Sequence, residues 1–128
     1  MSSPAWSWLG LRALEADAGR AVVEMDCTDD MRNHRGTVHG GFISALADSA
    51  MGRAMRSLMP DEGRHASFDL KLSFISPAQA GERLRAEGKV VHAGRRTGVC
   101  ECRVEGPGGR LVATASATFF LQRGTDAD

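Results

Sequence analysis

Apolar residues follow a helical period in the stretch that begins near Gly40. Four of them recur at intervals of four, three and four residues, which places them on one face of a helix: Ile43, Ala47, Ala50 and Ala54. Further apolar side chains widen this face beyond the stripe of a surface helix: Phe42, Leu46 and Met55. The pattern predicts a long central helix, buried over most of its circumference, that ends before the loop Met59–Gly63.

Alternating apolar and polar residues predict strands on both sides of this helix. Leu11–Glu15 and Ala21–Asp26 flank the turn signal D-A-G-R and are typical of a β-hairpin. Four extended runs follow the helix, and a glycine–proline hairpin turn joins the last two: Ala66–Phe74, Glu82–Ala93, Arg96–Gly106 and Arg110–Gln122. In the first of these runs the alternation is strict, which predicts a strand with one buried face.

The order of these elements predicts an α+β fold in which a curled antiparallel sheet wraps around one long central helix. We expect a single domain over residues 1–128, with an N-terminal segment at 1–10 and a frayed polar tail at 123–128. A lone helix that is apolar on most sides needs cover on the side that the sheet leaves open. A homodimer would provide that cover.

Composition narrows the choice of partners and compartment. Sixteen basic and sixteen acidic residues leave no net charge that would attract nucleic acid or a membrane surface, so we expect neither as a partner. The first residues lack the basic start and apolar core of a signal peptide, and no run is long enough to span a bilayer. Three cysteines do not form a disulfide framework, which favours the reducing cytoplasm: Cys27, Cys100 and Cys102.

Asp48 is the only ionisable side chain between Gly40 and Gly52. A carboxylate in an apolar helix is costly to desolvate, so it is expected to be paired, protonated or functional. Gly40 and Gly41 stand at the helix start, where unpaired N–H groups can bind an anion or an oxyanion. His39 and Asp48 are separated by about 13 Å of helix, so if the carboxylate and a helix start cooperate, we expect Asp48 to act with the helix start of a second subunit.

The motif N-x-x-G-x-x-H-G-G-x-x-x-x-L-x-D spans residues 33 to 48. This motif, the order of elements and the run S-F-D-L-K-L-S-F-I-S-P-A resemble the hotdog-fold thioesterases, and within them the phenylacetate-type (PaaI-like) acyl-CoA thioesterases. The resemblance covers about Leu11 to Gln122. It implies a hotdog fold, hydrolysis of an aromatic or medium-chain acyl-CoA, no cofactor, and a homodimer that pairs into a dimer of dimers.

The resemblance also assigns roles to residues of the motif. Asp48 takes the place of the nucleophile or general base, and Gly40 that of the glycine whose N–H polarises the thioester carbonyl. His39 matches the histidine beside the thioester, and Asn33 a polar residue near the carboxylate or the attacking water. Ser67 matches a strand serine that holds the water. In a regular strand, however, Ser67 would point away from the apolar set, so this role requires a bent strand or a site between subunits.

Substrate-binding residues are expected at two further places. Gly41 belongs to the helix start, and Arg95, Arg96 and Thr97 form a basic turn that in related enzymes meets the coenzyme A phosphates. For each site residue a structural role stays open: a helix-start glycine, a turn-forming Asn33, a solvated arginine turn. We expect no metal site, because the histidines and cysteines lack ligand spacing.

Two alternatives to the hydrolase stay open. A hotdog module that binds acyl-CoA without turnover would have no need of Asp48, and a hotdog hydratase would place its His and Asp differently. Trp6 and Trp8 lie in a short apolar segment, Pro4–Gly10, which is either a terminal segment docked on the body or a lid over a ligand channel.

Overall fold

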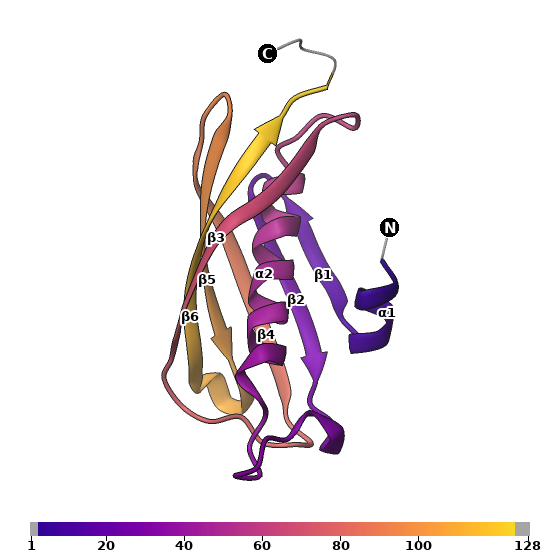
Figure 1. Ribbon diagram of the computed structural model, residues 1–128, viewed down its shortest axis with the longest axis vertical. Coiled ribbons are helices and arrows are strands. Elements are labelled where there is room, and N and C mark those ends of the chain that lie inside the picture. The colour runs from indigo at the N-terminus through magenta and orange to yellow at the C-terminus, as the bar shows by residue number, and fades with distance from the viewer. Residues whose placement is uncertain (1–2, 125–128) are drawn as a thin grey trace.

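The computed structural model describes residues 3–124. Its centre is one long helix, α2 (Gly40–Arg56), which lies against a six-stranded antiparallel sheet that curls around it (Figure 1). The sheet order is β1-β2-β4-β5-β6-β3, with these bounds: β1 Arg12–Asp17, β2 Arg20–Asp26, β3 Arg64–Phe74, β4 Arg83–Ala93, β5 Thr97–Glu105 and β6 Leu111–Gln122. This arrangement confirms the predicted α+β fold.

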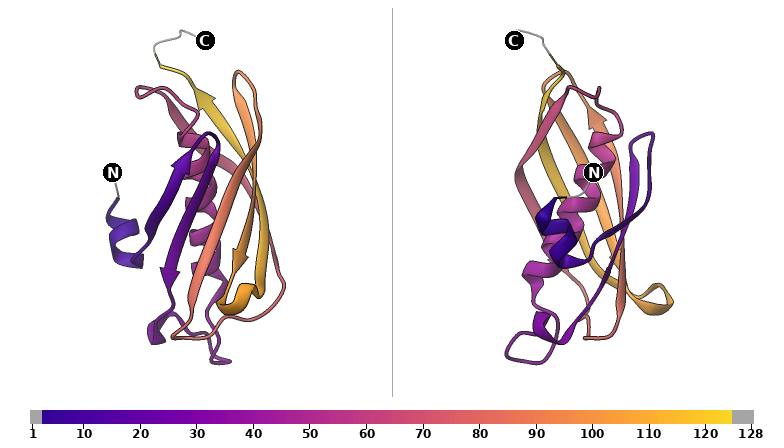
Figure 2. Two further views of the ribbon diagram at one scale, coloured as in Figure 1. Left: turned by 180° about the vertical axis from the view of Figure 1, so that it is seen from behind. Right: turned by 90° about the vertical axis from the view of Figure 1, so that its right-hand side faces the viewer.

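The predicted apolar face of α2 is the face that meets the sheet. All four residues of the stripe are buried, together with three neighbours: Ile43, Ala47, Ala50, Ala54, Leu46, Met51 and Met55. Seen from behind, the strands pass in front of the helix and hide much of it (Figure 2). Phe42 is only half-buried, so the helix is covered on one broad side and the opposite side carries its polar residues.

Short elements flank this core. The helix α1 (Pro4–Leu9) occupies the apolar N-terminal segment, and a 3₁₀ turn, η1 (Asp29–Met31), precedes the loop to α2. A second 3₁₀ turn, η2 (Pro107–Gly109), forms the β5–β6 hairpin connection. The predicted β1–β2 hairpin is confirmed, although β1 begins and ends later than expected.

The prediction for β3 was wrong in one respect. The strand is present, but it is an edge of the sheet, and its apolar side chains are largely exposed in the chain: Phe68 is 53% exposed and Phe74 is 56% exposed. A bulge between Ser67 and Asp69 divides the apolar set between the two faces. Strict alternation could not indicate either feature, because it assumes a regular strand with a covered face.

The ends of the chain complete the comparison with the sequence. Of the predicted N-terminal segment and tail, residues 1–2 and 125–128 lie outside the described residues. No helix within residues 3–124 has both the length and the apolar character needed to cross a bilayer.

Candidate active site

Asp48 lines a cavity of about 460 Å³ that lies along the C-terminal half of α2. Three elements besides α2 contribute to the walls, namely α1, the start of β3 and the end of β6. The lining residues are Trp6, Asp48, Ser49, Gly52, Arg53, Arg56, His65, Ala66, Ser67 and Phe119. Of these described lining residues, Asp48 alone carries a carboxylate. The lone acidic group of the helix therefore faces open space rather than a packed core.

The bulge in β3 brings Ser67 to this cavity. Ser67 pairs with Phe119 of β6, whose side chain is buried on the helix side of the sheet, and paired residues share a face. After the bulge Leu70 pairs with buried Ala117, so Ser67 and Leu70 face the same side. Phe68, the extra residue, instead stacks on exposed Phe120 with 4.2 Å between ring centroids. A bent strand was one of the two conditions for a catalytic Ser67, and this condition is met.

His65 is a cavity residue that the sequence pattern did not single out for this site. Its ring lies over Gly52, where an added Cβ would stand 3.8 Å from Cε1, and packs edge-on against Phe119. Gly52 follows Asp48 by one helical turn, so His65 lies on the same helix face as Asp48. Burial lowers the pKa of His65 below its ordinary value, the charge of Arg56 lowers it further, and the charge of Asp48 opposes both.

Two arginines complete the polar wall. Arg56 is held by the loop that follows the helix, since its guanidinium donates to the Gly63 carbonyl at 2.7 Å and to the Pro60 carbonyl. Arg53 stacks over the indole of Trp6 at 4.2 Å from the ring centroid. Helical spacing places position 53 one turn after Ser49, which also lines the cavity, but only the placement of α1 reveals the contact of Arg53 with Trp6.

The start of α2 forms a second, separate site. His39 is the N-cap, and its Nδ1 accepts a hydrogen bond from the Gly41 N–H at 2.9 Å. A neutral imidazole that accepts at Nδ1 carries its proton on Nε2, so the exposed edge of His39 is a donor. Within residues 3–124 the Gly40 N–H has no hydrogen-bond partner. The helix start therefore presents two donors, the Gly40 N–H and the His39 Nε2–H.

Gly40 also lies directly under an aromatic ring. A Cβ at this position would stand 2.9 Å from Cζ of Phe74, so the contact leaves no room for a side chain unless Phe74 moves. Gly40, Asn33 and Phe74 line one cavity of about 380 Å³. The absence of a side chain at Gly40 thus has a packing reason as well as a possible chemical one.

Asn33 stabilises the loop in front of the helix. Its Oδ1 accepts from the N–H groups of Arg35 and Thr37 at 2.9 and 3.2 Å, and its Nδ2 donates to Thr37 Oγ1 at 3.1 Å. These bonds are those of a turn-forming asparagine. They fix the loop that leads into the helix start, where Asn33 shares a cavity with Gly40 rather than with Asp48.

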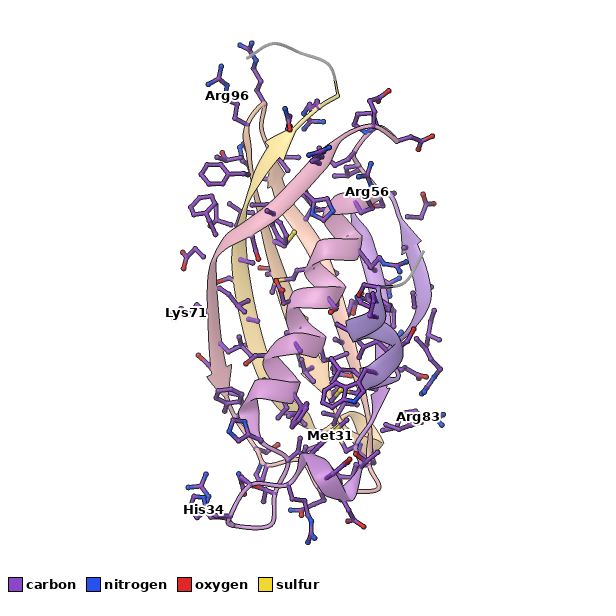
Figure 3. All side chains as sticks on the ribbon, turned by 45° about the vertical axis from the view of Figure 1, so that its right-hand side comes forward. Met31, His34, Arg56, Lys71, Arg83 and Arg96 are labelled. Carbon is purple, nitrogen blue, oxygen red and sulfur yellow. The ribbon has the colours of Figure 1, made fainter. Side chains whose placement is uncertain are left out.

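Within one chain the predicted site residues fall into three groups. Asp48 and Ser67 share the first cavity, whereas Asn33 and Gly40 line the second, with His39 and Gly41 at the same helix start. Gly40 and Asp48 are eight residues apart on one helix, which is about 12 Å. The turn with Arg95, Arg96 and Thr97 forms the third group. Arg96 stands at the opposite end of the molecule from His34 of the loop before α2 (Figure 3).

The three cysteines are poor candidates for a nucleophile. All are buried, and burial raises the pKa of Cys27 to about 11 and the pKa values of Cys100 and Cys102 to about 12. Thiols of this kind stay protonated and are weak nucleophiles near neutral pH. Within residues 3–124, no three His, Cys, Asp or Glu side chains gather as metal ligands.

Comparison with known proteins shows which family has this sequence and fold. The family model described as "Thioesterase superfamily" matches residues 35–113, which include the start of α2, Asp48 and Ser67. The chain belongs to the thioesterase superfamily. This membership confirms the prediction of a thioester hydrolase, and the structure of PaaI from Escherichia coli superposes with a TM-score of 0.90 at 29% identity, over 97% of this chain and 88% of that one.

Relatives with names of their own agree with this membership. The acyl-coenzyme A thioesterase PaaI of Escherichia coli is 34% identical over 82% of this chain and 73% of its own length. The acyl-coenzyme A thioesterase 13 of Pongo abelii is 29% identical over 84% of this chain and 77% of its own length. This thioesterase therefore has the predicted hotdog fold and is PaaI-like.

Proposed function

We propose that this thioesterase hydrolyses the thioester of an aromatic or medium-chain acyl-CoA to the free acid and coenzyme A. Its acyl-CoA substrate is suggested by the names of its relatives, PaaI among them. The observation that carries the proposal is the position of Asp48, which is the one carboxylate among the described lining residues of a cavity that Ser67 also lines.

Asp48 can act in either of two ways. As a nucleophile, a carboxylate oxygen attacks the thioester carbonyl carbon, the C–S bond breaks, the coenzyme A thiolate leaves and takes up a proton, and water hydrolyses the mixed anhydride. As a general base, Asp48 takes a proton from a water that adds to the carbonyl carbon, and the C–S bond breaks as the tetrahedral oxyanion collapses. Ser67 supports the second route, since its hydroxyl can hold the water.

The Gly40 N–H would stabilise the oxyanion, with the His39 Nε2–H beside the carbonyl or the leaving sulfur. One such donor contributes about 3–4 kcal/mol to a transition state with a developing oxyanion. Because Gly40 and Asp48 of one chain are about 12 Å apart, the donor would come from the helix start of a second copy.

The edge strand β3 supports a homodimer. It hydrogen-bonds to β6 on one side and leaves its other side as the edge of the sheet. Leu70 and Phe74 are exposed although their register places them on the helix side. Two copies paired along β3 would continue the sheet and cover these side chains, and a pair of such dimers would form the expected tetramer.

The coenzyme A portion would lie outside the cavity. Arg95 and Arg96 at the β4–β5 turn, with Thr97, remain our candidates for its phosphates, and Gly41 for the helix-start contact. The proposed chemistry uses a carboxylate, water and backbone N–H groups, so it calls for no resident cofactor. We expect the enzyme to work in the cytoplasm.

The test compares Asp48→Asn with wild type and with a matched control, Asp69→Asn. Asp69 lies on the same strand as Ser67 but pairs with Thr118 on the face away from the helix. Release of free thiol is measured over aromatic and medium-chain acyl-CoAs. We expect Asp48→Asn to lose at least about 10²-fold in rate, the scale of a lost acid–base group, and Asp69→Asn to retain wild-type activity.

Two outcomes would reject parts of the proposal. Equal rates for wild type and a folded Asp48→Asn variant would remove Asp48 from the mechanism. A wild-type protein that binds acyl-CoA but releases no thiol from any member of the panel would be a binding module instead.

A further inference from the structure

Trp6 lines the cavity that contains Asp48. The helix α2 supplies Asp48 on one wall, the start of β3 supplies Ser67 on another, and Trp6 reaches the cavity from α1. The helix α1 lies at the outside of the molecule next to β1 (Figure 1), so Trp6 is the lining residue that this outer helix contributes. An acyl group that extends from the carbonyl carbon near Asp48 toward α1 would end against this ring.

The indole is held in place, so it forms a wall rather than a loose flap. The backbone of Trp6 is fixed at both ends of α1, since its backbone N–H donates to Ser3 Oγ at 3.2 Å and its carbonyl accepts from the Leu11 N–H at 3.0 Å. Leu11 is buried, and Gly10 has the left-handed conformation that ends the helix. The guanidinium of Arg53 stacks on the ring from the α2 side. Both ends of α1 and one ring face are thus fixed.

Trp8, two residues further on, has a different environment. It is 77% exposed, its ring lies 6.4 Å from that of Phe42, and it lines a separate cavity with Met31. The chain therefore carries two tryptophans on one six-residue helix, of which Trp6 lines the Asp48 cavity and Trp8 lines another.

We infer that Trp6 is the specificity-determining residue that limits the length of the acyl group. The inference rests on the proposed function, because it takes the Asp48 cavity as the acyl site. The part of the indole that Arg53 leaves uncovered suits the end of a medium-chain alkyl group or a flat aromatic ring. Longer chains are excluded because they would have to displace a ring that α1 and Arg53 hold in place.

The first experiment measures kcat/KM for saturated acyl-CoAs from butanoyl to hexadecanoyl. The measurement compares wild type with Trp6→Ala, Trp6→Phe and the control Trp8→Ala. Each methylene that no longer fits costs about tenfold or more, so the wild-type profile should fall steeply beyond one chain length. We expect Trp6→Ala to move this limit upward by about two carbons or more, Trp6→Phe to move it less, and Trp8→Ala to leave it in place.

A second experiment requires no turnover. The sequence has two tryptophans and no tyrosine, so Trp8→Phe leaves Trp6 as the sole indole, and Trp6→Phe leaves Trp8. Each variant is titrated with S-alkyl coenzyme A thioethers, which cannot be hydrolysed. We expect the emission of Trp6 to change once the alkyl chain is long enough to reach it, and the emission of Trp8 to stay constant.

The two experiments separate failure of the inference from failure of the proposed function. A chain-length profile of Trp6→Ala that is parallel to wild type, together with a Trp6 emission that ignores the thioethers, overturns the inference while Asp48-dependent turnover stands. If no acyl-CoA is turned over but Trp6 emission responds to chain length, Trp6 still borders the acyl site and the hydrolase proposal fails. Equal responses at Trp6 and Trp8 also contradict the inference.

Discussion

Gly88 of β4 lies against the backbone of Ala50 in α2, so closely that a Cβ at position 88 would stand 2.7 Å from the Ala50 carbonyl oxygen. The neighbouring atoms are backbone as well, namely the Ala50 carbonyl carbon at 2.8 Å and the Met51 nitrogen at 2.9 Å. A helix backbone cannot turn away as a flexible side chain can. This contact therefore sets how closely the central helix approaches the sheet, and with it the position of Asp48 two residues earlier.

Replacing Gly88 by alanine should destabilise the protein by about 1–3 kcal/mol, because the added methyl group pushes α2 away from β4. The matched control is Gly52→Ala on the helix itself, where the nearest atom to an added Cβ is His65 Cε1 at 3.8 Å. Alanine has the higher helix propensity, so this variant should gain up to about 1 kcal/mol. Urea unfolding curves measure both, and a Gly88→Ala variant as stable as wild type would contradict the close packing.

The importance of Gly88 could not be predicted from the sequence, whereas the helix it supports could. The burial of Ile43, Ala47, Ala50 and Ala54 follows from their spacing, which is a local property of the chain. Contact between Gly88 and Ala50 depends on the pairing of β4 with β2 and β5, and on the curl of the whole sheet. No local pattern contains that information.

Some residues of the candidate site could likewise be predicted from the sequence, and others could not. Asp48 could be identified as a lone carboxylate in an apolar helix, and the helix-start glycines by their position. The orientation of Ser67 depended on a bulge, which strict alternation in the sequence conceals. His65 and Arg53 were missed because their relation to the site arises from strand placement and from α1, both of which are distant in the chain from Asp48.

The proposed use of the Gly40 N–H can be tested by removing that one hydrogen-bond donor. Gly40 is the first residue of α2, a position that tolerates proline, and His39 has the extended conformation that precedes proline. Gly40→Pro removes the N–H, whereas Gly40→Ala keeps it. Both variants add a Cβ that would meet the ring of Phe74, so alanine controls for that contact. We expect Gly40→Pro to be slower than Gly40→Ala by about 10²–10³-fold in kcat.

Mixing inactive variants then tests whether the site is shared between subunits. If Gly40 of one copy serves Asp48 of the other, a dimer of one Asp48→Asn chain and one Gly40→Pro chain contains one intact site. Random exchange of equal amounts should restore about one quarter of wild-type activity. Thiol release after co-refolding measures this, and a mixture as inactive as its components would show that both groups act within one chain.

His65 should make the folded protein less stable in mild acid. Its folded pKa lies below the ordinary 6.5, chiefly through burial and also through Arg56, whereas Asp48 opposes the shift. As pH falls through the ordinary value, the unfolded chain takes up a proton that the folded chain does not, so the free energy of unfolding decreases. At pH values above the ordinary pKa, where His65 is neutral in both states, the stability is at its full value. It decreases as the pH falls from the ordinary pKa toward the lower folded pKa.

His65→Gln should remove this dependence, because glutamine does not titrate. Urea unfolding at steps between about pH 7.5 and 5 gives the free energy of unfolding as a function of pH, with a maximal slope of about 1.4 kcal/mol per pH unit for one proton. We expect a smaller slope for His65→Gln than for wild type. The control His34→Gln changes an exposed loop histidine, which lies at the opposite end of the molecule from Arg96 (Figure 3), and should keep the wild-type slope. Identical slopes for His65→Gln and wild type would mean that the histidine at the Asp48 cavity is as free to take up a proton in the folded state as in the unfolded one.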